Sequence, residues 1–132
     1  MRFDLPTIEP ETEPFWEAAR NRRLLIQRCE ACERWQYYPR PFCASCWSGD
    51  VAWAEASGEA TLYTFSIVRR NDLPPFDERV PYVAAVVDLA EGPRMITEVV
   101  DCDHDAVEIG MPLDVTFRDL TDEVTIPVFR PS

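Results

Sequence analysis

The sequence is short of the groups on which catalysis and phosphate binding usually depend. Its 132 residues include one histidine, four glycines and no lysine, so all 13 basic side chains are arginines. The glycines are dispersed, which excludes a glycine-rich phosphate loop. His104 lies between Asp103 and Asp105, and although Cys102 is two residues away, nothing nearby in the sequence would orient a Cys/His pair. We therefore expect no catalytic residues and no activity of the chain alone.

Long apolar segments are also missing. No apolar run approaches the length of about 18 residues that marks a transmembrane helix, and the N-terminus has no signal-peptide pattern. Hydrophobic residues make up 46% of the chain and charged residues 28%, which is typical of one folded domain, or of a small one with a metal-held appendage. We expect a soluble protein of the cytoplasm, where thiols stay reduced.

Positive charge is scarce relative to negative charge. The chain has 24 acidic and 13 basic residues, a formal net charge of -11 at pH 7. A surface this acidic repels phosphate backbones at long range. We therefore expect no nucleic-acid binding, although Tyr63 and Phe65 could stack on bases.

One stretch, in contrast, is rich in metal-binding groups. Cys29-Glu-Ala-Cys32 is followed, ten residues later, by Cys43-Ala-Ser-Cys46. Two Cys-x-x-Cys pairs can place four sulfurs around one ion, the closed tetrahedral coordination of structural zinc. We therefore predict one Zn²⁺ per chain, bound by Cys29, Cys32, Cys43 and Cys46. Disulfides, unrelated buried cysteines and iron remain alternatives, because sulfur ligands alone do not exclude iron.

The segment before the cysteines predicts an arm, a helix and a strand. Residues 1–12 contain Pro6, Pro10 and several carboxylates, including Asp4, and are typical of an extended arm. A short helix then begins near Pro14, and Phe15 and Trp16 on its apolar side must pack on something. They could pack on this chain's own ribbon or brace a partner subunit. Residues 24–28 predict a strand that leads into the first cysteine pair.

After Ser57-Gly58-Glu59 the apolar pattern changes to a period of two. Strands are predicted at 63–67, 82–89, 95–100, 113–118 and 124–129. Five short strands with turns between them indicate a small barrel. Residues 82–89 are nearly all apolar, which predicts a strand covered on both faces, and Pro127 predicts that the last strand lies at an edge or ends its pairing there. The insertion 103–111 could hold one helical turn.

The connection at 69–81 is too long for a simple turn. It is polar at both ends, with Leu73 and Phe76 in the middle beside two prolines. Apolar residues on a proline-stiffened loop are typical of contact sites. Alternatively, Phe76 caps the open end of the barrel.

Several short motifs, in this order along the chain, resemble one known family. They are Arg28-Cys29-x-x-Cys32, Pro39-Arg40-x-x-Cys43-x-x-Cys46, Ser57-Gly58, Pro81-Tyr82-Val83, Glu91-Gly92-Pro93-Arg94, Ile109-Gly110-Met111-Pro112 and Phe129-Arg130-Pro131. Together they resemble the acyl-CoA-associated OB-fold proteins known as domain of unknown function 35. The resemblance covers essentially the whole chain. It implies a mainly β fold with a short N-terminal helix and rubredoxin-like zinc ribbon at 1–56 and a five-stranded OB-fold barrel at 57–132.

The same resemblance implies a role beside an enzyme. Family members are similar to partners of thiolase-fold enzymes, namely thiolases, thiolase-like aldolases that cleave the side chains of steroid CoA thioesters, and related acyl-CoA condensing enzymes. The chain would be a non-catalytic subunit of such a hetero-oligomer and would complete its acyl-CoA site, with a place in lipid metabolism or steroid degradation. Candidate contacts with the partner or with acyl-CoA are Arg69, Arg70, Phe76, Tyr82 and Arg94.

Two other functions stay open at this point, and so does one detail of the ribbon. A zinc ribbon beside an OB-fold can bind single-stranded nucleic acid, and a four-cysteine iron site can transfer electrons as rubredoxin does. Zinc knuckles often have glycine after the second cysteine, where left-handed backbone is needed, but Glu33 and Trp47 stand there instead.

Overall fold

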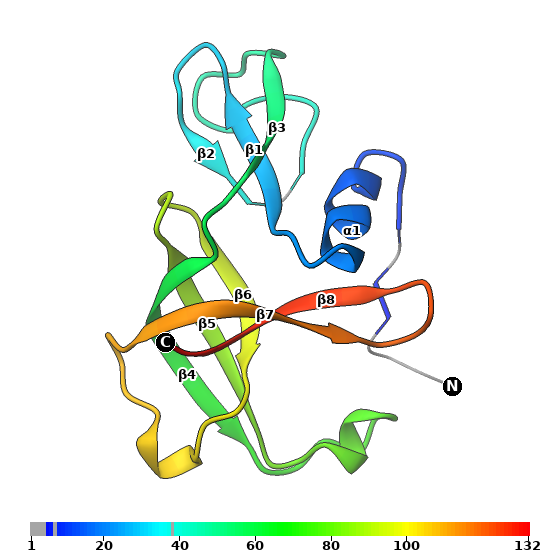
Figure 1. Ribbon diagram of the computed structural model, residues 1–132, viewed down its shortest axis with the longest axis vertical. Coiled ribbons are helices and arrows are strands. Elements are labelled where there is room, and N and C mark those ends of the chain that lie inside the picture. The colour runs from blue at the N-terminus through cyan, green and yellow to red at the C-terminus, as the bar shows by residue number, and fades with distance from the viewer. Residues whose placement is uncertain (1–4, 7, 38) are drawn as a thin grey trace.

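The computed structural model describes all residues except 1–4, 7 and 38. The arm predicted at 1–12, including Asp4, therefore lies partly outside the described residues. The described chain is mainly β with one short α-helix, as predicted. A three-stranded sheet stands above a closed five-stranded barrel, and the helix lies at the junction between them (Figure 1).

The helix α1 spans Glu13–Arg20, with a proline in its first turn. Thr12 precedes it without a side-chain cap to the helix backbone; its Oγ1 instead accepts a hydrogen bond from Trp16 Nε1 at 3.2 Å. Phe15 is buried and its ring packs edge-on against Tyr37 of the ribbon, with centroids 5.8 Å apart. The helix also contacts β1 and the barrel strands β7 and β8. Its apolar side therefore packs within this chain, on the ribbon and on the barrel.

The small sheet contains three antiparallel strands in the order β2-β1-β3. They are β1 (Leu25–Cys29), β2 (Trp35–Gln36) and β3 (Val51–Glu55). The strand predicted at 24–28 is confirmed, one residue further along the chain. The other two were not predicted, because a two-residue strand has no periodicity and β3 is a short strand that begins five residues after Cys46.

The barrel has the five strands predicted from the period of two. They are β4 (Glu59–Val68), β5 (Tyr82–Leu89), β6 (Arg94–Val99), β7 (Pro112–Asp119) and β8 (Thr125–Pro131). The order is β4-β5-β6-β8-β7, and β7 pairs back onto β4 to close the barrel. All pairs are antiparallel except β6 with β8, which are parallel and joined at Val99 and Phe129. Pro127 lies in β8 away from that bridge, so its missing N–H interrupts no pairing with β6.

The prediction that residues 82–89 are covered on both faces is wrong. Side chains of β5 alternate strictly between buried and half-exposed. The buried ones are Val83, Ala85, Val87 and Leu89, and the half-exposed ones are Tyr82, Ala84, Val86 and Asp88. Ile96, which pairs with Val86, is 80% exposed. Ala84 and Ile96 share a hollow with Phe15 and Trp16 of α1, so this outer face is only partly covered and its small apolar side chains remain in contact with solvent.

Gly58 joins the two parts of the molecule. Its φ is +87°, and a Cβ at this position would come within 2.5 Å of Val115 Cγ1. The Gly58 carbonyl accepts a hydrogen bond of 2.9 Å from the N–H of Val115. Both the left-handed backbone and the close approach require glycine here.

The two irregular segments at the far end of the barrel each contain one 3-10 turn. The loop at 69–81 includes η1 (Phe76–Glu78), and the insertion at 103–111 includes η2 (His104–Ala106), where a helical turn was predicted. Phe76 is half-buried, with its ring centroid 6.0 Å from that of Tyr82. Among the described residues, no helix is long and apolar enough to cross a membrane.

Candidate metal centre and contact surface

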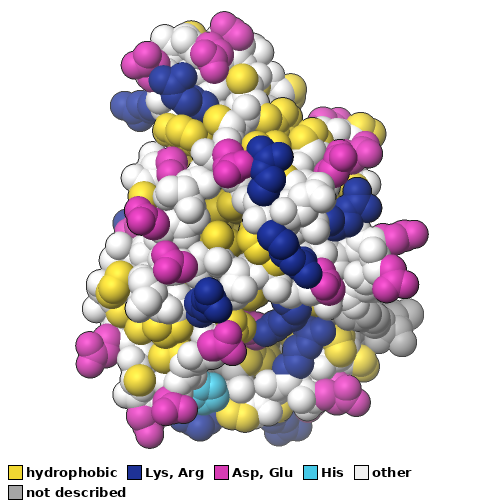
Figure 2. Space-filling view, viewed as in Figure 1, with side chains coloured by type: hydrophobic (Ala, Val, Ile, Leu, Met, Phe, Trp, Pro, Cys, Tyr) yellow, Lys and Arg dark blue, Asp and Glu magenta, His cyan; other side chains and the backbone are white. Residues whose placement is uncertain are grey.

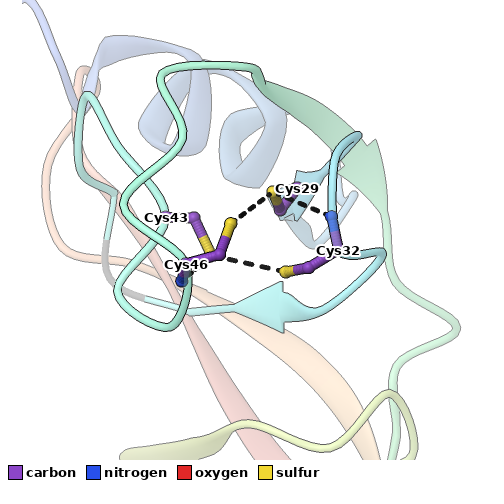
Figure 3. Close-up of side chains that lie close together, drawn as sticks. All are labelled: Cys29, Cys32, Cys43 and Cys46. Carbon is purple, nitrogen blue, oxygen red and sulfur yellow. Dashed lines mark hydrogen bonds between the residues drawn. The ribbon is translucent and has the colours of Figure 1, made fainter.

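The four cysteines of the two Cys-x-x-Cys pairs converge at the tip of the ribbon (Figure 3). Cys29 ends β1, Cys32 lies in the turn after it, and Cys43 and Cys46 lie in the loop before β3. Their Sγ atoms all lie within 4.8 Å of one another.

The spacing of the sulfurs fits a tetrahedral ion. The Sγ atoms of Cys29 and Cys46 are 3.6 Å apart, as are those of Cys32 and Cys43. Sulfurs about 2.3 Å from a zinc ion in a regular tetrahedron are separated by about 3.8 Å. A disulfide would need about 2.05 Å, and all four thiols are free. The donor set therefore suits a thiophilic cation in closed coordination, with no position left for a reactive water.

Backbone hydrogen bonds in the two Cys-x-x-Cys turns orient the sulfur atoms. In the first knuckle the N–H of Cys32 points at Cys29 Sγ at 3.4 Å, and the N–H of Glu33 donates to the carbonyl of Cys29 at 2.8 Å. In the second knuckle, the N–H of Trp47 likewise donates to the carbonyl of Cys43 at 2.9 Å. Glu33 and Trp47 both have φ of 65°, so the two knuckles keep the left-handed turn without glycine.

Electrostatics favour a cation at this point. Backbone N–H groups of Cys46, and then of Ser45, lower the pKa of Cys43 to about 6. The N–H of Ser48 lowers the pKa of Cys46, but burial and the three neighbouring cysteines raise it. Together they outweigh Ser48, and the pKa of Cys46 is raised to about 12. Cys43 therefore loses its proton easily, whereas Cys46 keeps its proton. A divalent ion removes that difference, since coordinated thiols lose their protons.

Two of the predicted contact residues, Phe76 and Tyr82, line one hollow of about 300 Å³. It lies between α1, Tyr37 of the ribbon, and strands β6 and β8 of the barrel. Tyr82 also lines a second hollow of about 370 Å³, which His104 borders. The two hollows share Arg79, Tyr82, Glu98 and Arg118. We call the pair of hollows the trough; it is apolar near α1 and charged towards its other end.

The other three predicted contact residues lie apart from the trough. Arg69 lines an adjoining open hollow of about 620 Å³ with Cys102 and His104. Arg70 is exposed and forms an ion pair with Asp72 at 3.3 Å. Arg94 begins β6, where its guanidinium stacks on Tyr63 with Cζ 3.6 Å from the ring centroid. The structure therefore brings Arg69, Phe76 and Tyr82 to one end of the barrel and leaves Arg94 elsewhere.

Sequence reasoning missed two arginines of the trough, Arg79 and Arg118. They come from the loop before β5 and from β7, and Arg118 forms an ion pair with Glu98 of β6. Figure 2 shows several basic side chains over the barrel on the viewed face, with acidic and hydrophobic side chains between them. Alternation on β7 placed Arg118 on its outer face, but only the fold places it beside Arg79.

Comparisons with known proteins agree with this architecture. Residues 16–52 match a family model described as the ChsH2 rubredoxin-like zinc ribbon domain, and residues 53–118 match one described as the ChsH2 C-terminal OB-fold domain. A solved structure described as "Ltp2-ChsH2(DUF35) aldolase" is similar, with a TM-score of 0.86 and 39% identity over 96% of this chain and 98% of that chain.

Two curated relatives differ in length. A DUF35 domain-containing scaffold protein of Methanothermobacter thermautotrophicus is 30% identical over 86% of both chains. A probable enoyl-CoA hydratase alpha subunit of Thermomonospora curvata is 39% identical over 96% of this chain, but the match spans only 39% of the relative. This chain therefore corresponds to about two fifths of that alpha subunit.

Fold and site together define an OB-fold protein with a four-cysteine zinc ribbon. The chain belongs to the DUF35 family, in its ChsH2-like form. The domain boundary predicted between 56 and 57 stays a prediction: β3 of the ribbon sheet ends at Glu55, whereas the match to the OB-fold model begins at 53.

Proposed function

We propose that this protein is a non-catalytic subunit of a thiolase-fold enzyme and completes that enzyme's acyl-CoA site. The observation that carries the proposal is the similarity, at 39% identity over nearly the whole chain, to the ChsH2(DUF35) component named in an Ltp2-ChsH2 aldolase. Thiolase-fold partnership is what the family resemblance implies. The sequence supports the same role, since it has one histidine and thioester chemistry needs a nucleophile or a base of tuned pKa.

The ribbon is the structural part of this proposal. One Zn²⁺ per chain, held by the four cysteines, would take the place of an apolar core in a sheet too small to have one. When bound, zinc in this closed coordination supplies rigidity rather than catalysis. It would hold α1 and the ribbon in place beside the trough.

The trough and the surface beside it are the proposed contact with acyl-CoA and the partner. Phe76, Tyr82 and Trp16 offer apolar surface, while Arg79 and Arg118 lie at the border of the same hollow. Arg69 lies beyond them, in the adjoining hollow. Arginine suits planar recognition of phosphate or carboxylate, and apolar surface suits an acyl chain or a partner's side chain. Arg70 and Arg94 remain candidate contacts outside the trough. Steroid thioesters are one acyl-CoA class that the family resemblance implies.

Binding to a candidate thiolase-fold protein, sought first among the proteins encoded next to this chain, tests the proposal. Calorimetry should detect a complex, and acyl-CoA cleavage or condensation should require both proteins. Phe76→Ala should weaken binding roughly 30-fold, the value of a hot spot of about 2 kcal/mol, and leave the zinc content unchanged. Ile109→Ala is the matched control: it also removes a large apolar side chain, but from an exposed site in the loop at 103–111, outside the proposed contact.

Two outcomes would count against the proposal in different ways. Wild-type affinity and activity in the Phe76 variant would remove the loop at 69–81 from the interface. Turnover of an acyl-CoA by the isolated chain would overturn the accessory role itself. Nucleic-acid binding is disfavoured by the net charge of -11.

A further inference from the structure

The ribbon contains both glutamines of the chain, Gln27 and Gln36, and they lie opposite one another in the β1–β2 pair. Gln27 is 5% exposed. Gln36 Nε2 donates to Gln27 Oε1 at 2.7 Å, which ties the two amides together. Side chains two residues apart on a strand share a face, so Gln27 lies on the same face of β1 as Cys29.

The amide of Gln27 holds the backbone of Arg40. Its Oε1 accepts from the N–H of Arg40 at 2.8 Å, and its Nε2 donates to the carbonyl of Arg40 at 2.9 Å. A residue of a neighbouring β-strand would exchange the same two bonds. Arg40 lies outside every strand, so a side chain supplies the pairing that a sheet would otherwise supply.

The amide of Gln36 holds the backbone on both sides of Cys43. Its Nε2 donates to the carbonyl of Phe42 at 3.1 Å, and its Oε1 accepts from the N–H of Ala44 at 3.0 Å. The second cysteine pair is thus attached through amides to the strands that precede and follow the first pair.

We infer that Gln27 and Gln36 form an amide clamp that positions the second cysteine pair against the first, and so sets the affinity of the site for its metal. The glutamines are positioning residues, since the four cysteines are the ligand set and the glutamine amides bind backbone groups instead. This inference rests on the metal-binding part of the proposed function and is independent of any partner. Groups that orient metal ligands typically change metal affinity by roughly 10- to 100-fold when removed.

Gln27→Met and Gln36→Met test the clamp, because methionine keeps the length and loses the amide. Competition with a chromophoric chelator should show zinc affinity lowered by roughly 10- to 100-fold in each variant. Cobalt substituted for zinc should show a weaker thiolate charge-transfer band as Cys43 is released. Thr97→Val is the control, since it removes a side-chain bond to Pro127 in the barrel instead.

Hydrogen exchange separates the clamp from the metal. In the wild type the N–H groups of Arg40 and Ala44 should be protected; Gln27→Met should expose the first and Gln36→Met the second. Wild-type zinc affinity and unchanged exchange in both variants would overturn the clamp. Absence of zinc from the wild-type protein would instead overturn the metal proposal, and the exchange of the two amides would still decide the clamp. Gln36→Met keeps the test valid if Gln27→Met does not fold, because Gln36 is only half-buried.

Discussion

The ribbon and the barrel of this protein are held together by different forces. The barrel buries apolar side chains from all five strands; Leu62, Val83, Val87, Leu113 and Phe129 are each at most 1% exposed. The described ribbon has one aliphatic side chain buried to that degree, Ile26, together with Cys29, and joins its cysteine loops through sulfurs and glutamine amides. Ile26 belongs to the same apolar cluster as the barrel residues, so the ribbon shares the edge of the barrel's core rather than having one of its own. Two adjacent units of one chain thus depend on hydrophobic burial to different degrees, and four tests can separate them.

Loss of the metal should have the largest effect, and the effect should be confined to the ribbon. Metal binding in small zinc domains contributes on the order of 10 kcal/mol to folding. Cys29→Ser or a strong chelator should therefore disorder 25–55 while the barrel strands keep their protection from hydrogen exchange. Cys102→Ser is the matched control, because the fifth cysteine lies outside the cluster. Full metal content in Cys29→Ser, or a red iron-loaded protein, would contradict the zinc site.

A cavity in the barrel core should have the converse effect. Phe129 is fully buried, and Phe129→Ala should lower the free energy of unfolding by about 3–5 kcal/mol. Zinc content should stay at the wild-type level. As a control, Ile96→Ala on the exposed outer face should change the free energy of unfolding by less than about 0.5 kcal/mol. Urea denaturation with metal analysis measures both quantities, and loss of zinc in Phe129→Ala would show that the two units are coupled.

Glycine in the first knuckle should stabilise the ribbon slightly. Glu33 has φ of 65° and is exposed, so Glu33→Gly removes backbone strain at the expense of one weak ion pair with Arg28. We expect a gain of about 1 kcal/mol. Trp47→Gly is the informative comparison, because Trp47 also stacks on Phe42 with ring centroids 5.3 Å apart. Thermal unfolding of the metal-loaded chains should show a gain for the first variant and none for the second.

The smallest effect should come from the ion pair that ties the end of α1 to the barrel. Arg22 donates two hydrogen bonds of 2.8 Å to Asp119. These bonds, and then Thr125, lower the pKa of Asp119 well below its ordinary value. Stabilisation from a lowered carboxyl pKa is present above the unfolded-state value of about 4 and is lost as the pH falls.

Asp119→Asn should therefore destabilise the protein at pH 7 and make progressively less difference below pH 4. Both ends of the ion pair are more than half exposed, so added salt should also shrink the difference. Urea denaturation across this pH range measures it, with Asp122→Asn as the control. An equal difference between the variant and the wild type at pH 7 and at pH 3 would exclude Asp119 as the titrating group.

The barrel was predictable because its strands carry their own pattern. Alternation at 63–67 and 113–118 identified β4 and β7. The second face of β5 was predicted wrongly, and so was the edge position of β8, which lies between β6 and β7 and stays paired with β7 on both sides of Pro127. The error in β5 has a physical cause: apolar content reports that a strand can be covered, but whether another element covers it depends on the rest of the chain. Helix α1 was predicted, yet only the structure showed that it packs on the ribbon and the barrel together.

The metal cluster was predictable for a different reason. Cys-x-x-Cys places two sulfurs on one turn, so the ligand set is a local property repeated twice. The strands around it were not predictable: β2 has two residues, and its place is set by the cysteine loops. The amide clamp could not be predicted either, because Gln27 and Arg40 are 13 positions apart and no sequence pattern marks a glutamine that binds a distant backbone.

By itself, then, the sequence determined the ligand set, the five barrel strands and the acidic charge, since each depends on residues near one another in the chain or on composition. Only the tertiary structure decided which groups come together across long separations: Phe15 packs on Tyr37, Gln27 binds the backbone of Arg40, and Arg79 and Arg118 line the same hollow. Such contacts form because strand pairing and barrel closure bring distant segments together, and no local pattern along the chain records them.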